Sequence, residues 1–378
     1  MFTQNPSILS LILLSVLGLC ILVQLVYHFY YFLSLPKQTD VDFENVEWTP
    51  VSIVVCAQNE IDNLKILIPA LLEQDYPKFE LIIIEDASWD ESKEYLEELE
   101  ENESRLKVVY ITEGMKKNYL GKKLGLSLGI KASKNPILIF TDADCVPESK
   151  MWLKHMAFPY HQNSNTEIVL GYSPFEKANT LINLISRMDN AYTGLMYLSF
   201  ANKKQAYMGV GRNLSYKRDL FFKNNGFAKH LHIAPGDDDL FVNQNCNAKN
   251  TAICIHTEAF VNTHAKTSFY TWFRQKKRHN FAGKYYKSKD QFKLGLYASF
   301  HALLWISFVA NLFVYESLGW ALILLGLYWL IKWPIIYNSF KKLKQTGIVI
   351  WMPIFDILYV FYNVFFGLVA IFGRQKKW

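Results

Sequence analysis

Acidic side chains end three apolar runs of this sequence. The runs VSIVVCAQNE, LIIIEDAS and ILIFTDAD begin at residues 51, 81 and 137, and their acidic residues are Glu60, Glu85, Asp86, Asp142 and Asp144. A D-x-D pair such as Asp142 and Asp144 can bind Mg²⁺ or Mn²⁺ through oxygen while phosphate groups complete the coordination shell. Taken alone, TDAD is more typical of a turn or a helix cap. Its place after an apolar strand, together with the other motifs, favours a metal site that would neutralise a diphosphate.

A second acidic cluster, GDDDL, occupies residues 236–240. Adjacent carboxylates repel one another, so such a cluster is costly unless a cation, a shared proton or an incoming hydroxyl group compensates the charge. A carboxylate in this setting can act as a general base. An exposed acidic turn is the simpler alternative.

The order of strands and helices predicts where these acidic groups meet. From residue 51 onward, strand and helix patterns alternate: strands are expected at 51–55, 79–84, 106–111 and 137–140, and helices at 63–72, 91–101 and 121–131. This alternation is typical of a parallel sheet with right-handed crossover helices. Ligands of such sheets bind beyond the carboxyl ends of the strands. We therefore expect one binding face that carries the three acidic strand ends.

Long apolar segments flank this block. The chain is 51% hydrophobic and 16% aromatic, which is high for a soluble protein. Residues 9–33 are uncharged and long enough to cross a bilayer, and they lack the basic n-region of a signal peptide. We expect this segment to remain as an anchor. Residues 295–315 and 318–336 predict a transmembrane hairpin, because only a short polar link separates them.

Lysines gather beside these apolar segments. The formal net charge is +6, and much of the excess lies at 284–293 and 341–344. The positive-inside tendency places both clusters, and hence residues 36–293, in the cytoplasm. Lysines that flank membrane segments need no nucleic-acid partner, and we find no nucleic-acid module.

The last apolar segment, residues 348–372, leaves two topologies open. A full crossing would export Arg374, Lys376 and Lys377, against the positive-inside tendency. Pro353 breaks a helix near its start, and Asp356 is costly in the middle of a bilayer. We therefore expect a re-entrant or interfacial path and a cytoplasmic carboxyl terminus.

Cysteine and histidine give little support for a zinc site. The five cysteines show no C-x-x-C spacing, and buried free thiols in a reducing compartment are the preferred interpretation. We expect His230 and His232 on an exposed loop.

The acidic strand ends, GDDDL, the MGVGRN segment at 208–213 and the QKKRH segment at 275–279 occur in the order found in membrane-bound family 2 glycosyltransferases. The chain resembles this family, which includes relatives of cellulose and hyaluronan synthases, over nearly its whole length. The resemblance implies an α/β fold: a GT-A (nucleotide-diphospho-sugar transferase, Rossmann-like) domain flanked by transmembrane helices. The implied domains are an anchor at 1–35, a cytoplasmic GT-A domain at 36–293 with an interfacial segment near 268–290, and at 294–378 a transmembrane hairpin plus a spanning or re-entrant segment.

The resemblance also assigns roles to residues. Asp144 would bind the metal together with Asp142, and Asp238 would be the general base, or Asp237 if the alignment shifts by one. Nucleotide-sugar contacts fall on Ala57, Gln58, Glu60, Asp86, Lys122, Asp142, Gln275 and Arg278, and acceptor contacts on Gly211, Arg212, Asn213 and His279. Two alternatives remain: Asn59 and Glu60 could cap the following helix, and residues 274–279 could bind anionic lipid headgroups. His279 replaces the family's tryptophan, which leaves processivity open.

The implied reaction is an inverting transfer that depends on Mg²⁺ or Mn²⁺. A hexose or N-acetylhexosamine would move from a UDP-sugar donor to a hydroxyl of a lipid-linked or growing polysaccharide acceptor, in a multi-pass protein of the inner (plasma) membrane that also contacts lipid. A polyprenyl-phosphate sugar transferase is the alternative within enzymes. A catalytically silent subunit of a polysaccharide export complex that senses nucleotide sugar is the alternative outside them.

Overall fold

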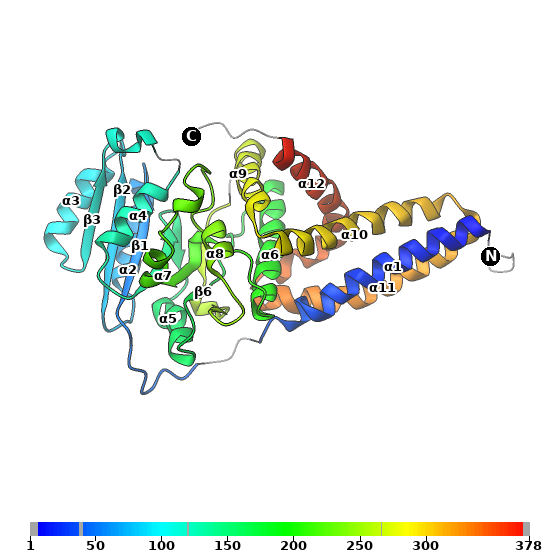
Figure 1. The fold of residues 1–378 in the computed structure, drawn as a ribbon, viewed down its shortest axis with the longest axis horizontal. Helices are drawn as coiled ribbons and strands as arrows, with labels where there is room; N and C mark the ends of the chain where they lie inside the picture. Colours follow the sequence, from blue (N-terminus) through cyan, green and yellow to red (C-terminus); the bar gives the residue numbers. More distant parts are fainter. Residues whose placement is uncertain (1–6, 38–40, 119–120, 266, 373–378) are drawn as a thin grey trace.

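Long helices extend from one side of an α/β domain (Figure 1). The computed structural model describes residues 7–37, 41–118, 121–265 and 267–372. Besides the elements treated below, it contains the 3-10 helices η1 (Phe32–Ser34), η2 (Glu113–Asn118), η3 (Gly211–Asn213), η4 (Ala228–His230), η5 (Thr257–Ala259) and η6 (Gly283–Tyr285).

The domain is built on a seven-stranded sheet with the order β3-β2-β1-β4-β7-β6-β8. Four strands are parallel, as the sequence predicts: β1 (Val51–Ala57), β2 (Phe79–Asp86), β3 (Leu106–Ile111) and β4 (Ile137–Asp142). β1 lies between β2 and β4, so the acidic ends of three neighbouring strands share one edge of the sheet.

The rest of the sheet differs from the predicted parallel arrangement. β7 (Leu214–Lys217) runs antiparallel to β4, β6 (Ile168–Leu170) runs antiparallel to β7, and β8 (Thr251–Ile253) runs parallel to β6. The sheet is therefore mixed. These strands have only three or four residues, too few for the alternation of apolar residues to show in the sequence.

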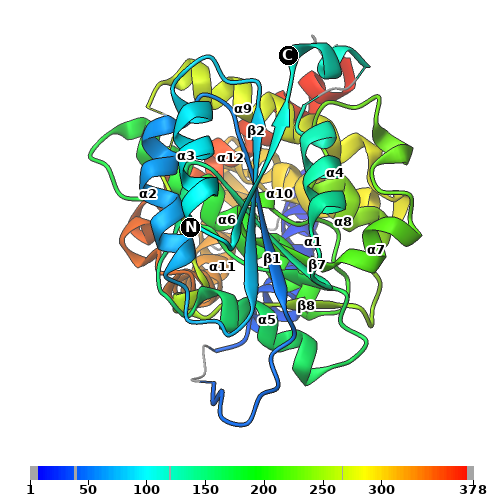
Figure 2. The same cartoon turned by 90° about the vertical axis from the view of Figure 1, so that its left-hand side faces the viewer.

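Helices cover both faces of the sheet (Figure 2). One face carries α2 (Ile61–Leu72), α3 (Ser92–Asn102) and α5 (Trp152–Gln162), and the other carries α4 (Lys123–Ala132), α7 (Arg218–Lys223) and α8 (Asp239–Asn245). Successive strand side chains point to opposite faces. Ile53 and Val55 accordingly join the core under α2, whereas Val54 and Cys56 join the core under α4.

A small second sheet extends the acidic edge. β5 (Cys145–Pro147) pairs antiparallel with β9 (Val261–Thr263). The Thr263 hydroxyl donates to the Asp144 carbonyl at 2.9 Å. This hydrogen bond holds the backbone of Asp144, two residues after the end of β4, against β9.

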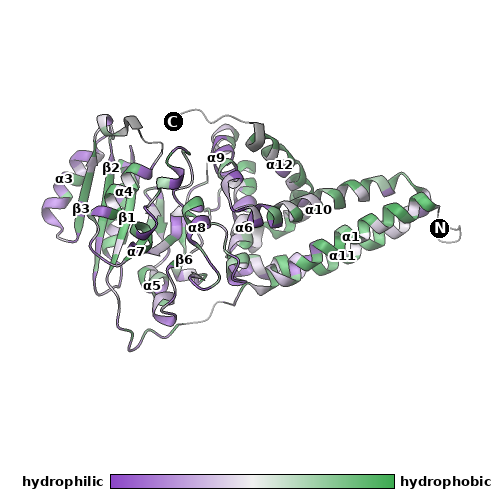
Figure 3. Cartoon of the chain, viewed as in Figure 1, coloured by the Kyte–Doolittle hydropathy of each residue, from purple (hydrophilic) through white to green (hydrophobic). Residues whose placement is uncertain are grey.

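Three of the apolar helices form a bundle. α1 (Ile8–Tyr30), α10 (Ser288–Leu312) and α11 (Tyr315–Lys342) run side by side away from the domain, and hydrophobic residues predominate along them (Figure 3). α10 begins seven residues before the predicted span, because its first turns carry charged side chains that contact the domain. Asp290, for example, accepts a hydrogen bond from Asn243 at 3.0 Å.

The fourth apolar helix takes a different direction. η7 (Thr346–Trp351) and α12 (Met352–Phe372) follow α11, and α12 turns back beside α9 (Phe269–Ala282) of the domain (Figure 1). Trp272 and Phe273 of α9 contact Phe366 of α12, with ring centroids 6.2 and 5.5 Å apart. The described residues thus include four helices that are long and apolar enough to cross a membrane. They confirm the predicted apolar segments.

Asp356 is paired where α12 meets the bundle. Lys332 of α11 lies 2.5 Å and His301 of α10 lies 3.0 Å from one carboxylate oxygen of Asp356, while the indole of Trp305 donates to the other at 3.1 Å. Charged groups in an apolar bundle are costly unless they are paired. These contacts therefore tie α12 to both of its neighbours.

The central helix of the molecule is α6 (Leu181–Asn202). It lies between the sheet and the apolar helices (Figure 1). Fourteen of its 22 residues are buried. α6 thus contacts both the domain and the apolar helices.

Candidate functional site

The loops after β1 and β2 are joined by hydrogen bonds. The Asn59 backbone N–H donates to the Ser88 hydroxyl at 3.0 Å, and the Trp89 N–H donates to the Asn59 side chain at 2.8 Å. Gln58 donates to the Asp86 carbonyl at 2.9 Å. The two loops therefore form one continuous surface at the acidic edge of the sheet.

The two acidic residues that end β2 have different surroundings. Glu85 is buried, and its carboxylate accepts the Ser88 N–H at 2.5 Å. Asp86 is only half-buried. Glu85 therefore holds the loop in place, and Asp86 is the better placed of the two to meet a ligand.

Glu60 does not use its side chain to cap α2. It occupies the N-cap position without a side-chain hydrogen bond to the helix. Asp90 accepts the first N–H of the helix, that of Ile61, at 3.1 Å instead. The Glu60 carboxylate accepts from the Asn63 amide at 2.5 Å. These contacts weigh against the capping alternative for Glu60.

Cations surround Asp142 at the end of β4. The Lys122 ammonium lies 2.7 Å from one carboxylate oxygen of Asp142. Partial burial raises the pKa of Asp142, but the charges of Lys122, Arg212 and Arg278 together hold the pKa below its usual value. The resemblance implied that Lys122 and Arg278 contact the nucleotide sugar. The structure places both near the D-x-D pair.

Asp142 and Asp144 fit a divalent cation. Their carboxylate oxygens and the Cys145 sulfur lie within 4.8 Å of one another. Two carboxylates with open positions for phosphate oxygens suit Mg²⁺ or Mn²⁺. The Cys145 thiol is a soft ligand and is fully buried, so it suits such a cation less well than the two carboxylates do.

A second group with metal-type side chains is less suited to an ion. His155, His256 and Glu258 also lie within 4.8 Å of one another. The two imidazole rings, however, stack with centroids 4.0 Å apart and planes 11° apart. The lone pairs of ring nitrogens lie in the ring planes, so two parallel rings do not point at a common ion. We therefore interpret this group as packing.

The loop before the GDDDL cluster is anchored by a buried lysine. The Lys123 ammonium is fully buried and donates to the carbonyls of Ile233, Ala234 (3.2 Å) and Pro235 (2.7 Å). Gly236 follows with φ +97°, a conformation that a side chain would strain. The cluster is therefore held against the start of α4, next to Lys122.

Asp238 has the surroundings of a general base. Its two carboxylate oxygens accept the backbone N–H groups of Gly211 at 2.9 Å and Asp239 at 2.7 Å. Burial and the neighbouring Asp237 raise the pKa of Asp238 to about 6. A carboxylate with a raised pKa is still ionised near neutral pH and accepts a proton more readily.

The three aspartates of the cluster have different roles. Asp239 is buried, accepts from the Tyr286 hydroxyl at 2.9 Å and begins α8. Burial and the charge of Asp238 raise the pKa of Asp239 well above its usual value. Asp237 and Asp238 are half-buried. The structure therefore leaves these two as the carboxylates that can face an acceptor.

The segment predicted to contact the acceptor lies beside the cluster. A Cβ atom on Gly211 would lie 3.4 Å from the Asp238 side chain, an ordinary van der Waals distance, so the two loops are in contact but this contact does not require glycine. The Arg212 guanidinium donates to Asn190 of α6 at 2.9 Å and stacks over Phe175 at 4.7 Å. Arg212 thus projects between α6 and the acidic edge.

The Asn213 side chain forms its hydrogen bonds within the protein. Its side chain is buried, and its amide donates to the carbonyls of Tyr172 and Ala259 at 2.9 and 2.7 Å. Its side-chain oxygen accepts from the Trp152 indole at 3.1 Å. Asn213 therefore supports the loop, rather than presenting its amide to an acceptor hydroxyl as the resemblance implied.

α9 carries the Gln275–His279 motif and is anchored on both sides. Lys276 pairs with the buried Asp189 of α6, and Asn280 donates to the Tyr362 hydroxyl of α12 at 3.2 Å. Gln275 is half-buried, and His279 is exposed. α9, which carries Arg278, is thus attached to both α6 and α12.

Some expectations from the sequence were wrong or incomplete. His230, expected on an exposed loop, is buried beside Phe227, with ring centroids 5.8 Å apart. Lys123 was missed, because nothing in the sequence separates its role from that of Lys122. All five cysteines are buried and free, as predicted.

Comparisons with known proteins relate this chain to glycosyltransferases. Residues 52–223 match the family described as Glycosyl transferase family 2. The glycosyltransferase AglE of Haloferax volcanii is 24% identical over 189 residues, which are 50% of this chain and 58% of AglE. The match therefore spans less than two thirds of that relative.

A solved structure shares the fold. The mannosyltransferase PcManGT from Pyrobaculum calidifontis, solved in complex with GDP-Man and Mn²⁺, superposes with a TM-score of 0.58. The comparison covers 95% of this chain and 100% of that chain, at 16% identity. Together with the family match, it confirms the expected fold class, a GT-A α/β domain beside apolar helices.

Proposed function

We propose, from the premise that residues 52–223 make this chain a family 2 glycosyltransferase, that it is an inverting and metal-dependent enzyme. The proposed donor is a UDP-linked hexose or N-acetylhexosamine, and the acceptor is a hydroxyl of a lipid-linked or growing polysaccharide. One observation carries the proposal. The Asp238 carboxylate, whose pKa is raised, accepts the Gly211 N–H, and the charge of Arg212, the residue after Gly211, lowers the pKa of Asp142. The candidate base therefore lies close to the candidate metal site.

The reaction would proceed by a single displacement. The acceptor oxygen attacks the anomeric carbon, and the bond from that carbon to the diphosphate breaks. The nucleoside diphosphate leaves with the bonding electrons. Asp238 takes the proton of the acceptor hydroxyl as the new bond forms. Attack from the face opposite the diphosphate inverts the anomeric configuration.

The donor end of this site is arranged to stabilise the leaving group. Asp142 and Asp144 would hold a divalent cation that neutralises the diphosphate. Lys122, paired with Asp142 at 2.7 Å, and Arg278 would approach the phosphate oxygens. Ala57, Gln58, Glu60 and Asp86 would line the nucleoside pocket, and Gln275 would contact the diphosphate. PcManGT was solved with GDP-Man and Mn²⁺, which supports a nucleotide-sugar donor and a divalent metal. It does not decide which nucleobase the donor of this chain carries.

The test of this proposal is nucleotide release by the purified full-length protein in detergent. Separate reactions would contain Mn²⁺, a membrane lipid extract and UDP-glucose, UDP-N-acetylglucosamine or GDP-mannose. We expect lipid-dependent release of UDP and a product of inverted configuration. Release from GDP-mannose alone would contradict the uridine assignment. A folded protein that releases nucleotide from none of the donors would favour the silent subunit.

We also propose a topology in which residues 36–293 are cytoplasmic and α12 does not cross the membrane. α12 ends beside α9 rather than at the far end of the bundle, and Asp356 is paired within the protein. Phe269 and Tyr270 of α9 are 63% and 67% exposed, which suits an interfacial segment near 268–290. Residues 1–35 would then be the anchor and 294–378 a hairpin followed by a re-entrant segment. Arg374, Lys376 and Lys377 lie outside the described residues.

A cysteine added after Trp378 in an otherwise cysteine-free variant tests this topology. A membrane-impermeant thiol reagent should label it in lysed cells and leave it unlabelled in intact cells. A cysteine in the loop at Val314, between α10 and α11, is the matched control and should be labelled in intact cells. Labelling of both positions in intact cells would show that α12 crosses.

A further inference from the structure

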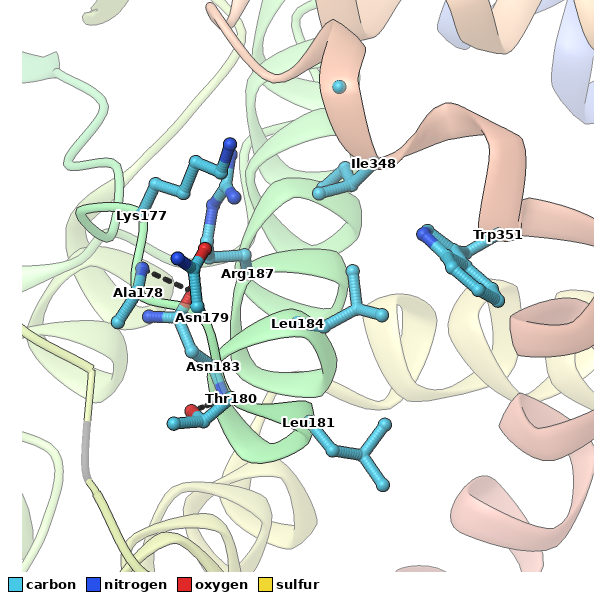
Figure 4. A pocket seen from close by; sticks show the side chains of 11 residues that line it. Lys177, Ala178, Asn179, Thr180, Leu181, Asn183, Leu184, Arg187, Ile348 and Trp351 are labelled. Atoms are coloured by element: carbon cyan, nitrogen blue, oxygen red, sulfur yellow. Dashed lines mark hydrogen bonds between the residues drawn. The ribbon is translucent and has the colours of Figure 1, made fainter.

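A pocket opens at the amino-terminal end of α6, where this helix faces η7 (Figure 4). Its volume is about 360 Å³. Lys177 and Arg187 line one side, and Leu181, Ile348 and Trp351 line the other. The pocket lies outside the acidic edge of the sheet, and the proposed function assigns no role to the residues that line it.

The polar side of the pocket is positively charged. Arg187 donates through two guanidinium nitrogens to the Gln345 side-chain oxygen, at 2.8 and 3.1 Å, and that partner is neutral. No acidic side chain lines the pocket among the described residues. α6, a helix of 22 residues, begins here at the N-cap Thr180, so the positive end of its dipole adds to the two cations. The positive charge of the pocket therefore favours binding of an anion.

The other side of the pocket is apolar and faces the region of the spans. Leu181 is 73% exposed and Trp351 is 47% exposed. Trp351 ends η7, at the start of the fourth apolar segment, Thr346–Val369. Tryptophan is enriched where a membrane protein meets the headgroup region. A ligand of this pocket would therefore have an anionic head and an apolar body.

The pocket is connected to the proposed base through α6. Arg187 and Asn190 are one turn apart on this helix, a rise of about 4.5 Å. Asn190 accepts from Arg212 at 2.9 Å, and Gly211, the residue before it, donates to Asp238. One guanidinium nitrogen of Arg212 is buried without a partner in the described part of the chain. Such a donor suits a polar group that extends from the pocket towards Asp238.

We propose that this pocket binds the phosphate or diphosphate of a lipid-linked acceptor, with Lys177 and Arg187 on the phosphate and Leu181 and Trp351 on the lipid chain. The inference rests on the proposed function and narrows its acceptor to an anionic membrane lipid. The sugar attached to the phosphate would then pass Arg212 and present its hydroxyl to Asp238.

Binding of undecaprenyl phosphate to the full-length protein in a non-ionic detergent, measured by native mass spectrometry, tests the pocket. The double variant Lys177→Gln with Arg187→Gln should bind this lipid about tenfold more weakly or worse, since each lost charge-assisted contact to phosphate weakens affinity. The charge-matched control is Lys131→Gln with Lys249→Gln, two exposed lysines away from the pocket. It should bind as the wild type does.

Two outcomes would overturn the inference. One is equal binding by the wild type and the pocket variant. The other is displacement of the lipid by inorganic phosphate at low millimolar concentration, which would show a site for free anions. The assay contains no nucleotide sugar, so its result is independent of sugar transfer. A protein that binds the lipid but transfers no sugar would count against the proposed function alone.

Discussion

Replacing Asp238 with asparagine is expected to slow sugar transfer by a factor of about 10² to 10⁴, the usual contribution of acid–base catalysis. Asparagine has nearly the same shape, but its single side-chain oxygen can accept only one of the two N–H groups, those of Gly211 and Asp239, that the carboxylate accepts, so folding of the variant is checked by thermal unfolding. Its amide cannot take the proton of an acceptor hydroxyl. Transfer should therefore fall while the affinity for the nucleotide sugar stays the same, as measured by product formation and by donor titration.

Asp237→Asn is the matched control for this variant, because both carboxylates are half-buried in the same cluster. It should retain more activity than Asp238→Asn. A larger loss in Asp237→Asn would move the base by one residue. An equal loss of donor affinity in Asp238→Asn would instead make Asp238 a donor ligand.

The pH dependence of the wild type provides a second check on the same residue. The pKa of Asp238 is raised to about 6, and only the ionised form can act as a base. Transfer should therefore be pH-independent above about pH 7 and fall roughly tenfold per pH unit below about pH 6. A profile that stays flat down to pH 5, with folded protein and bound metal, would contradict this role.

The acidic edge of the sheet could be predicted from the sequence because Asp86, Asp142 and Asp144 lie at or just after the ends of apolar strands. Asp86 and Asp142 end two parallel strands, β2 and β4, that both pair with β1, and the apolar runs of these strands are buried on both faces of the sheet. The carboxyl ends of parallel strands meet by construction. Chain order and strand polarity thus bring the acidic ends together without any knowledge of side-chain contacts.

The roles of neighbouring identical residues could not be predicted in this way. Lys122 and Lys123 differ only by one step along the chain, yet Lys122 pairs with Asp142 and Lys123 is buried under the GDDDL loop. The start of α4 sends the two side chains in different directions. Only the tertiary position of residues 233–235 explains why Lys123 is buried.

Interactions between distant elements were equally hidden. Asp356 was expected to be costly in a bilayer, but its partners Lys332 and His301 come from two other helices. The contact of α12 with α9 depends on aromatic side chains, which occur throughout this chain. The sequence therefore indicated that residues 348–372 differ from an ordinary membrane span. The packing shows that they lie against α9 and that Asp356 pairs with α10 and α11.

Replacing Asp144 with alanine is expected to abolish measurable nucleotide release. The variant removes one of the two carboxylates that fit the cation, and a bound metal contributes several kcal/mol to stabilising a leaving group, or roughly 10³-fold or more in rate. Asp142 would remain as the only carboxylate of the pair, and its charge is already shared with Lys122, so it should hold the cation much more weakly on its own. The affinity for Mn²⁺, measured by electron paramagnetic resonance, should fall together with nucleotide release.

The chain offers a control that separates loss of the metal from loss of local structure. Cys145 is the third member of the same group, and Cys145→Ala removes the thiol while it keeps both carboxylates. If oxygen ligands alone hold the ion, this variant should bind Mn²⁺ as the wild type does. Loss of Mn²⁺ binding in folded Cys145→Ala would make the sulfur a ligand. Unchanged turnover of the wild type in excess EDTA would remove the metal from the mechanism, since Lys122 and Arg278 would then suffice to neutralise the diphosphate.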